Sequence, residues 1–268
     1  MKKKDIIICI CFLLLAGCTA SKHAAQPASQ GLLVPNGPAW AALWQQRSAE
    51  YKALCFQAYN IAKERLDSYL LQPGIKNPAV ITDIDETVLD NSPYEAHEAL
   101  NNALYSDSSW MVWTAKVACD TVPGALSFLK YAASRGIQVF YITNRLEAEK
   151  KVTVANLKKW SFPNADDEHV LLKANKSNKD DRRNFVANNH TVLLLLGDNL
   201  GDFESIFDHQ SYEKRNELAE ENSIKFGSRF IVLPNPMYGE WQGALINYQY
   251  SKSKEQQNAE MLKWLKTY

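Results

Sequence analysis

The residues best suited to chemistry lie in one polar loop that directly follows a short β-rich run at 79–82. The loop starts with Asp83 and Asp85 and continues with Glu86, Thr87, Asp90 and Asn91. Open α/β sheets place their chemistry at the carboxyl ends of strands, where two aspartates one residue apart can share a divalent cation. A calcium loop of the EF-hand kind is disfavoured because its sixth position needs glycine, and Val88 stands there.

Polar groups also follow three later β-rich runs. They are Thr143-Asn144 after 137–142, Lys179 in the helix after 169–172, and Gly197-Asp198-Asn199 with Asp202 after 191–196. Right-handed crossovers keep such strands parallel, so all four strand ends should meet at one edge of the sheet. A carboxylate attacking a phosphate dianion at about 3.5 Å meets a repulsion of about 9 kcal/mol at an effective dielectric of 20. A shared Mg²⁺ and a nearby lysine would make this term favourable, so the pattern predicts phosphoryl transfer.

The elements that must position these groups alternate between strands and helices. Alternation of this kind predicts an α/β fold with a doubly wound, Rossmann-like parallel sheet. After Thr191, the run 191–196 is wholly apolar, as expected for a strand at the centre of such a sheet. Before the polar loop, apolar residues recur at helical spacing over 39–71 until Pro73 and Gly74 end the pattern. A last strand is expected at 229–233 and a terminal helix at about 261–265.

Two segments of the chain resemble the signature segments of a known family. The segments 83–94 (DIDETVLDNSPY) and 196–203 (LGDNLGDF) are similar to those of the class C bacterial acid phosphatases, of the lipoprotein e type, in the haloacid dehalogenase superfamily. The resemblance implies a sheet of the haloacid dehalogenase type within a phosphatase domain at 39–268. It also implies a small helical cap lobe from about 39–71 and 92–120.

The resemblance assigns two different tasks to the aspartates of the loop. Asp83 would be the nucleophile that forms an aspartyl-phosphate. Asp85 would protonate the leaving alcohol and then activate water. The implied cofactor is Mg²⁺, held by the Asp83 carboxylate, the backbone carbonyl of Asp85 and Asp198, with Asp202 supporting a metal-bound water.

The phosphoryl oxygens would be held by Thr143, Asn144 and Lys179. Two other lysines, Lys173 and Lys176, lie in the same stretch of sequence, and Lys179 fits the spacing of the family best.

The family stacks the aromatic parts of its substrates between aromatic side chains, and Trp110 and Tyr238 match that pair by position. Both are equally compatible with ordinary packing. The resulting expectation is an acid phosphatase or 5′-nucleotidase that hydrolyses small phosphomonoesters, with 5′-nucleotides or nicotinamide mononucleotide as substrates. Two alternatives stay open: a broad or sugar-phosphate phosphatase, and a non-catalytic binding lipoprotein on the same fold.

The amino terminus predicts export and lipid anchoring. A basic start and an apolar stretch at 6–16 form a signal peptide over 1–17, because eleven apolar positions are too few to span a bilayer. Leu15-Ala16-Gly17-Cys18 resembles the bacterial lipobox, which implies lipidation of Cys18, palmitate included, and anchoring to the membrane of the cell envelope. The residue after Cys18 is not aspartate, which favours the outer membrane. Residues 18–38, rich in Ala, Ser, Gln and Pro, are predicted to be a flexible tether.

Bulk composition and cysteine content set the remaining limits. The chain has 268 residues, 46% of them hydrophobic, and a formal net charge of zero. No long-range field therefore favours a nucleic acid polymer as partner. Cys55 and Cys119 are the cysteines that remain after Cys18, and they would form a disulfide or stay as two buried thiols. The resemblance implies a homodimer.

Overall fold

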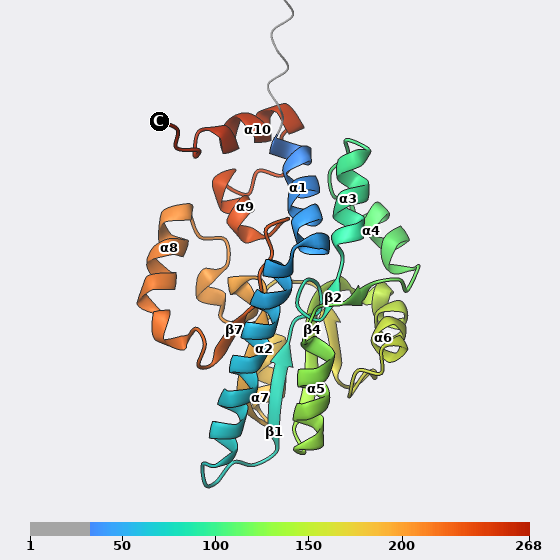
Figure 1. Cartoon of the computed structure of the whole chain (residues 1–268), viewed down its shortest axis with the longest axis vertical. Coiled ribbons are helices and arrows are strands. Elements are labelled where there is room, and N and C mark those ends of the chain that lie inside the picture. The colour runs from blue at the N-terminus through green and yellow to red at the C-terminus, as the bar shows by residue number, and fades with distance from the viewer. Residues whose placement is uncertain (1–32) are drawn as a thin grey trace, which may run out of the picture. The chain divides into compact units, whose positions relative to one another are not determined.

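The computed structural model describes residues 33–268, so the predicted signal peptide, Cys18 and most of the predicted tether lie outside the described residues. The centre of the fold is a five-stranded sheet with the order β5-β4-β1-β6-β7, in which every pair of neighbours is parallel (Figure 1). Its strands are β1 (Pro78–Thr82), β4 (Gln138–Leu146), β5 (Val170–Lys173), β6 (Thr191–Gly197) and β7 (Phe230–Val232). The predicted doubly wound parallel sheet is confirmed.

The strand order places a topological switch beside β1. The chain passes from β1 to β4 and β5 on one side and then crosses to β6 and β7 on the other. The β1–β6 register aligns Pro78 with Thr191 and Thr82 with Leu196, so the two strands end side by side. Open α/β sheets bind ligands outside the carboxyl ends of their strands at such a switch point.

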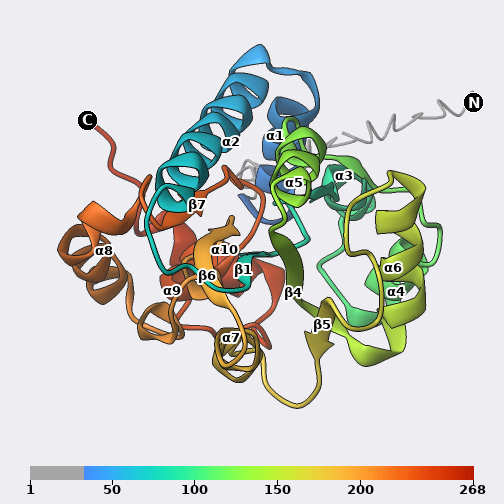
Figure 2. The same ribbon diagram turned by 90° about the horizontal axis from the view of Figure 1, so that it is seen from below.

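Helices cover both faces of the sheet, because its strands are apolar on both sides (Figure 2). On one face, α2 (Ala49–Leu70), α5 (Ala125–Ser134) and α6 (Lys150–Lys159) contribute buried side chains to the larger core, among them Leu66, Leu129 and Leu157. On the opposite face, α7 (Asp180–Ala187) contributes Val186 to a second core around Phe203 and Phe230. The sheet is therefore a rigid support for whatever lies at its edge.

An insertion follows the loop after β1. The two-stranded antiparallel pair β2 (Leu89–Asp90) and β3 (Asp120–Thr121) closes its base, and α3 (Ser92–Leu100) and α4 (Asp107–Thr114) lie between them. Helix α1 (Leu33–Arg47) packs against α3 and against α10 (Lys254–Leu262) (Figure 1). The insertion thus stands beside the carboxyl end of β1.

Two boundary predictions are wrong. The predicted tether reaches residue 38, but α1 begins at Leu33 and contains Pro38. Proline and glycine made this stretch resemble a linker, whereas the helix is stabilised by packing on α3 and α10. The helical spacing predicted over 39–71 corresponds to the two helices α1 and α2, and Ser48 caps α2 by accepting a hydrogen bond from the backbone N–H of Tyr51. The predicted cap lobe included residues 39–71, but α2, which makes up most of this stretch, packs in the main core against the sheet.

The remaining elements lie mainly in the carboxyl-terminal part of the chain. They are the helices α8 (Tyr212–Glu221) and α9 (Glu240–Leu245) and the 3₁₀ turns η1 (Glu147–Glu149), η2 (Leu200–Asp202), η3 (Ser205–Phe207) and η4 (Ser223–Lys225). Cys55 and Cys119 are both buried free thiols, which decides between the two alternatives left open by the sequence. Among residues 33–268, no helix has the length and apolar character needed to cross a membrane.

Candidate active site

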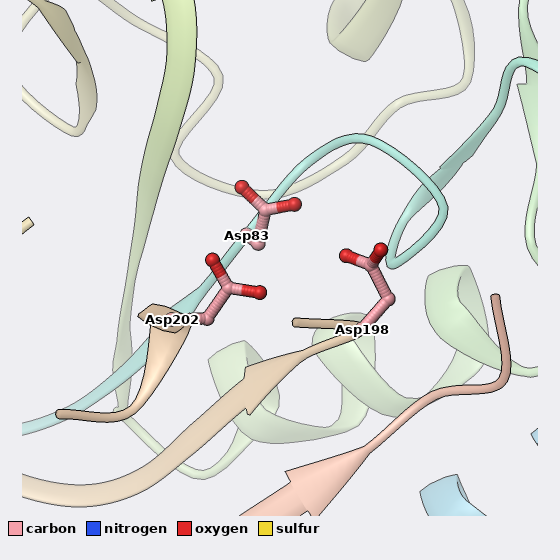
Figure 3. A group of neighbouring side chains, drawn as sticks. All are labelled: Asp83, Asp198 and Asp202. Carbon is pink, nitrogen blue, oxygen red and sulfur yellow. The ribbon is translucent and has the colours of Figure 1, made fainter. Parts of the chain in front are cut away.

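Three carboxylates converge at the switch point of the sheet (Figure 3). Asp83 directly follows β1, Asp198 directly follows β6, and Asp202 belongs to η2 just beyond it. One oxygen of each residue lies within 4.8 Å of the others. The backbone N–H of Asp83 donates to the carbonyl of Leu196 at 2.9 Å, which extends the β1–β6 ladder to the predicted nucleophile. The two strand ends therefore hold Asp83 and Asp198 in register.

We call Asp83, Asp198 and Asp202 the aspartate triad, and each member of the triad is oriented by hydrogen bonds. Asp198 accepts from the Thr87 hydroxyl at 3.3 Å and from the Asn235 amide at 2.8 Å. Asp202 accepts from the backbone N–H of Asn199 at 2.9 Å, within a single 3₁₀ turn. This turn leaves no room for a side chain at Gly197, where an added Cβ would lie 2.4 Å from the Asp202 side chain.

Lys179 is the predicted lysine, and the structure brings it into the triad. Its ammonium donates to Asp83 at 2.5 Å and to Asp202 at 2.6 Å, and the residue is only 4% exposed. It lies at the amino-terminal cap of α7, at the end of the segment that follows β5. The neighbouring lysines differ, since Lys176 is exposed and Lys173 is only partly buried. The buried position is the one that contacts both carboxylates.

The triad carries more negative charge than its lysine balances. Burial, reinforced by Asp202 and Asp85 and opposed by Lys179, raises the pKa of Asp83 to about 7. Burial and the two neighbouring carboxylates likewise raise the pKa of Asp198 well above its usual range. Mg²⁺ prefers oxygen ligands, and clustered carboxylates short of positive charge form a suitable donor set. The residues present therefore fit a divalent cation held by Asp83, Asp198 and Asp202.

The carboxylate of Asp85 points to different partners from those of Asp83. Arg145 donates to it through Nη2 at 2.7 Å and through Nε at 3.1 Å, and the Asn91 amide donates at 2.8 Å. The Thr143 hydroxyl adds a longer contact at 3.3 Å. Two aspartates one residue apart thus occupy different environments, which is what separate tasks require. The contact predicted between the metal and the Asp85 backbone carbonyl stays a prediction.

The predicted phosphate-binding residues lie at the same edge of the sheet. Thr143 is fully buried, and its carbonyl accepts from Arg182 at 2.5 Å. Asn144 is exposed, and its side-chain oxygen accepts from the same guanidinium at 2.8 Å. Strand β4 continues through both residues to Leu146 rather than ending before them, with an irregular register beyond Ile142. Their contact with phosphate stays a prediction.

The two predicted aromatic residues come from opposite sides of the site. Trp110, on α4, is buried and has the Arg145 guanidinium 5.7 Å from its ring centroid. Tyr238 follows β7, and its hydroxyl donates to Glu86. A cavity of about 270 Å³ lies beside Asp198 and is lined by Tyr238 and Trp241 among other residues. Aromatic surface therefore stands next to the carboxylates.

Sequence reasoning missed several residues that build the site. Arg145 was detectable, because residues two apart on a strand share a face and Thr143 was already a candidate. Asn235 follows β7, the last strand, and the strand-end argument applied to it equally. The hydrogen bonds of Glu86 with Tyr238 and of Asn91 with Trp113 had no signal in the sequence, because they depend on the fold of the loop.

The chain belongs to the haloacid dehalogenase superfamily, subfamily IIIB, the acid phosphatases. The model of that family matches residues 17–241. The chain is accordingly an acid phosphatase that acts on small-molecule phosphate substrates, and phosphatases of this superfamily use a divalent metal.

Solved structures agree with this assignment. The chain is similar to the class C acid phosphatase from Bacillus anthracis, at 38% identity and a TM-score of 0.84, covering 87% of this chain and 98% of that one. The same enzyme with tungstate bound gives a TM-score of 0.85 at 38% identity over 88% and 99% of the two chains. The predicted family and its fold type are confirmed.

Curated relatives are more distant. Stem 31 kDa glycoprotein from Glycine max is 29% identical over 205 residues, which cover 72% of this chain and 69% of that protein. Acid phosphatase 1 from Solanum lycopersicum is 27% identical over 167 residues, covering 59% of this chain and 57% of that protein.

Proposed function

We propose that this acid phosphatase is a Mg²⁺-dependent 5′-nucleotidase of the bacterial envelope that works through an aspartyl-phosphate. The observation that carries the proposal is the double contact of Lys179 with Asp83 and Asp202 beside Asp198. These four side chains would supply a nucleophile, a cation site and a fixed positive charge within one small volume. Bound Mg²⁺ would neutralise the repulsion between the nucleophile and the phosphate.

The protein's own groups divide the reaction into two steps. An Asp83 oxygen forms the bond to phosphorus while the bond from phosphorus to the ester oxygen breaks, and Asp85 gives its proton to that oxygen. Water then attacks the aspartyl-phosphate, Asp85 takes a proton from the water, and Asp83 and inorganic phosphate are released. Arg145 and Asn91 fix the orientation of the Asp85 carboxylate for both transfers. Lys179 and Thr143 would hold the phosphoryl oxygens.

Aromatic side chains favour substrates with an aromatic leaving group. Trp110 and Tyr238 stand on two sides of the catalytic loop, joined to it through Arg145 and Glu86 respectively. Stacking on a base or a nicotinamide ring would select 5′-nucleotides or nicotinamide mononucleotide over sugar phosphates, because aromatic pairs favour stacked or edge contacts.

The amino-terminal sequence supports the proposed cellular setting. Lipidation at Cys18 would attach the enzyme to the envelope, and the absence of aspartate at the next position favours the outer membrane. A homodimer is part of the same proposal.

The decisive experiment is a substrate panel with Mg²⁺ and with chelator. Adenosine 5′-phosphate should be hydrolysed in preference to glucose 6-phosphate, and the chelator should abolish both activities. Asp83→Asn should remove turnover while its circular dichroism spectrum stays that of the wild type. Equal rates on the two substrates would instead favour the broad phosphatase. An inactive wild type would favour the binding lipoprotein.

A further inference from the structure

Glu86 is a fully buried carboxylate that the reaction steps do not use, yet both of its oxygens are engaged. Oε1 accepts from the backbone N–H of Asn91 at 2.6 Å. Oε2 accepts from the Tyr238 hydroxyl and lies 3.3 Å from the Asn91 side-chain amide. The residue therefore joins the segment after β7 to the first residue of the insertion.

The backbone of Glu86 has a left-handed conformation that favours glycine over a residue with a side chain. Its φ angle is 57°, in the left-handed region where a residue with a Cβ is disfavoured by roughly 1–2 kcal/mol. Glycine would adopt this conformation freely. Strain of this kind persists where the surrounding contacts require the residue, and here those contacts are Asn91 and Tyr238.

The two residues that contact Glu86, Asn91 and Tyr238, connect it to the two predicted substrate-stacking residues, because Asn91 contacts the helix of Trp110 and Tyr238 is itself the second one. On the insertion side, the Asn91 side-chain oxygen accepts from the indole N–H of Trp113 at 2.8 Å. Trp113 lies one helical turn after Trp110 on α4, so Asn91 fixes the helix that carries Trp110. On the other side, Tyr238 is held at its backbone through Asn235 and at its hydroxyl by Glu86.

We propose that Glu86 is a positioning residue that sets the separation of Tyr238 from α4, and thereby the size of leaving group that the site admits. This role rests on the proposed function, in which Trp110 and Tyr238 hold an aromatic leaving group. Glutamine in its place has one acceptor oxygen and one amide donor, so accepting from the Asn91 N–H leaves no acceptor for the proton of the Tyr238 hydroxyl.

The test compares Glu86→Gln, Tyr238→Phe and the double variant on two phosphomonoesters. Adenosine 5′-phosphate presents an aromatic leaving group, and a short alkyl phosphate presents none. Each single variant should raise KM for the nucleotide about tenfold, the order expected for the loss of one hydrogen bond, and change KM for the alkyl phosphate less than twofold. The double variant should be no worse than the worse single variant, because both changes break the same link.

Two controls protect the comparison. Tyr248→Phe also removes a part-buried tyrosine hydroxyl bond, to the Gln210 carbonyl at 2.9 Å, and should leave both KM values unchanged. Glu86→Gly keeps the left-handed backbone of the loop, so it gives the same KM pattern even if the glutamine variant folds poorly. Calorimetric binding of adenosine, which needs no turnover, should weaken about tenfold in all variants at these two positions.

The outcomes separate the role of Glu86 from the proposed function. Additive losses in the double variant, or equal losses on both esters, would show that Glu86 does not act through Tyr238. Failure of the wild type to bind adenosine would overturn the role as well. A wild type that binds adenosine but hydrolyses neither ester would refute the proposed function alone, and the adenosine affinities of the variants would still decide the role of Glu86.

Discussion

Replacing Lys179 with methionine should destabilise the protein, because it leaves the buried carboxylates of Asp83 and Asp202 without their positive partner. The substitution keeps the length of the side chain and removes the only ammonium that contacts Asp83 and Asp202 among the described residues. Lys176→Met is the matched control, since it lies three residues away in the same segment and is exposed. In the sequence, only the spacing of the family favoured Lys179 over Lys176, so the pair of variants tests the assignment directly.

The expected loss of stability follows from the burial of the pair. Lys179 is 4% exposed and Asp83 is 8% exposed. Removing one partner of a buried ion pair costs about 3–5 kcal/mol, because the other charges stay buried without compensation. In a domain of this size that corresponds to a fall in Tm of about 10 °C. The effect should shrink when Mg²⁺ is added, because the cation compensates the same carboxylates.

Thermal unfolding in chelator measures the loss of stability, and thermal unfolding with added Mg²⁺ measures how far the cation restores it. Phosphatase assays of the same variants run in parallel. The pKa of Lys179 is raised, because Asp202 and Asp83 outweigh the effect of burial. A raised lysine pKa means that the stabilisation is fully present below the usual lysine pKa and disappears only in strong alkali. The two variants should thus differ throughout the neutral range. Equal melting of Lys179→Met and wild type in chelator at pH 7 would refute the reasoning.

Three further predictions use other parts of the structure. Gly197→Ala should displace the Asp202 side chain, destabilise the protein by about 1–3 kcal/mol and lower turnover, as urea unfolding and assays would show. Burial raises the pKa of Glu95 to about 7, so stability is lost as pH rises from the unfolded value of 4.5 through 7. Glu95→Gln should therefore stabilise the protein by about 2 kcal/mol at pH 8 and not at pH 4, whereas equal effects at both would contradict this. Cys55 and Cys119 should each titrate as a free thiol in denaturant without reductant, and reductant should leave Tm unchanged.

The strand-end argument explains why part of the site was predictable from sequence. Asp83 and Asp198 each stand just beyond a β-rich run, and parallel strands bring such positions together whatever the details of packing. Lys179 was predictable only through the spacing of the family, because a lysine near the start of a helix is ordinary in itself.

The remaining features depend on tertiary contacts. The pairing of Asp85 with Arg145 spans 60 residues and depends on the course of β4 beyond its apolar run. The start of α1 at Leu33 depends on packing against α3 and α10, and local composition pointed the other way. Similarly, periodicity showed that α2 is amphipathic without showing that its partner is the sheet.

The contact between Lys179 and Asp83 joins residues 96 positions apart, and Asp202 lies beyond both in the sequence. A growing chain therefore exposes Asp83 long before its lysine and the last carboxylate of the triad have been synthesised. Contacts of such high sequence separation form late in folding, because closing the loop between them is entropically unfavourable. Hydrolytic competence should accordingly appear only when the β1–β6 pairing is complete, so nascent and partly folded chains would not attack phosphate esters in the compartment where they are made.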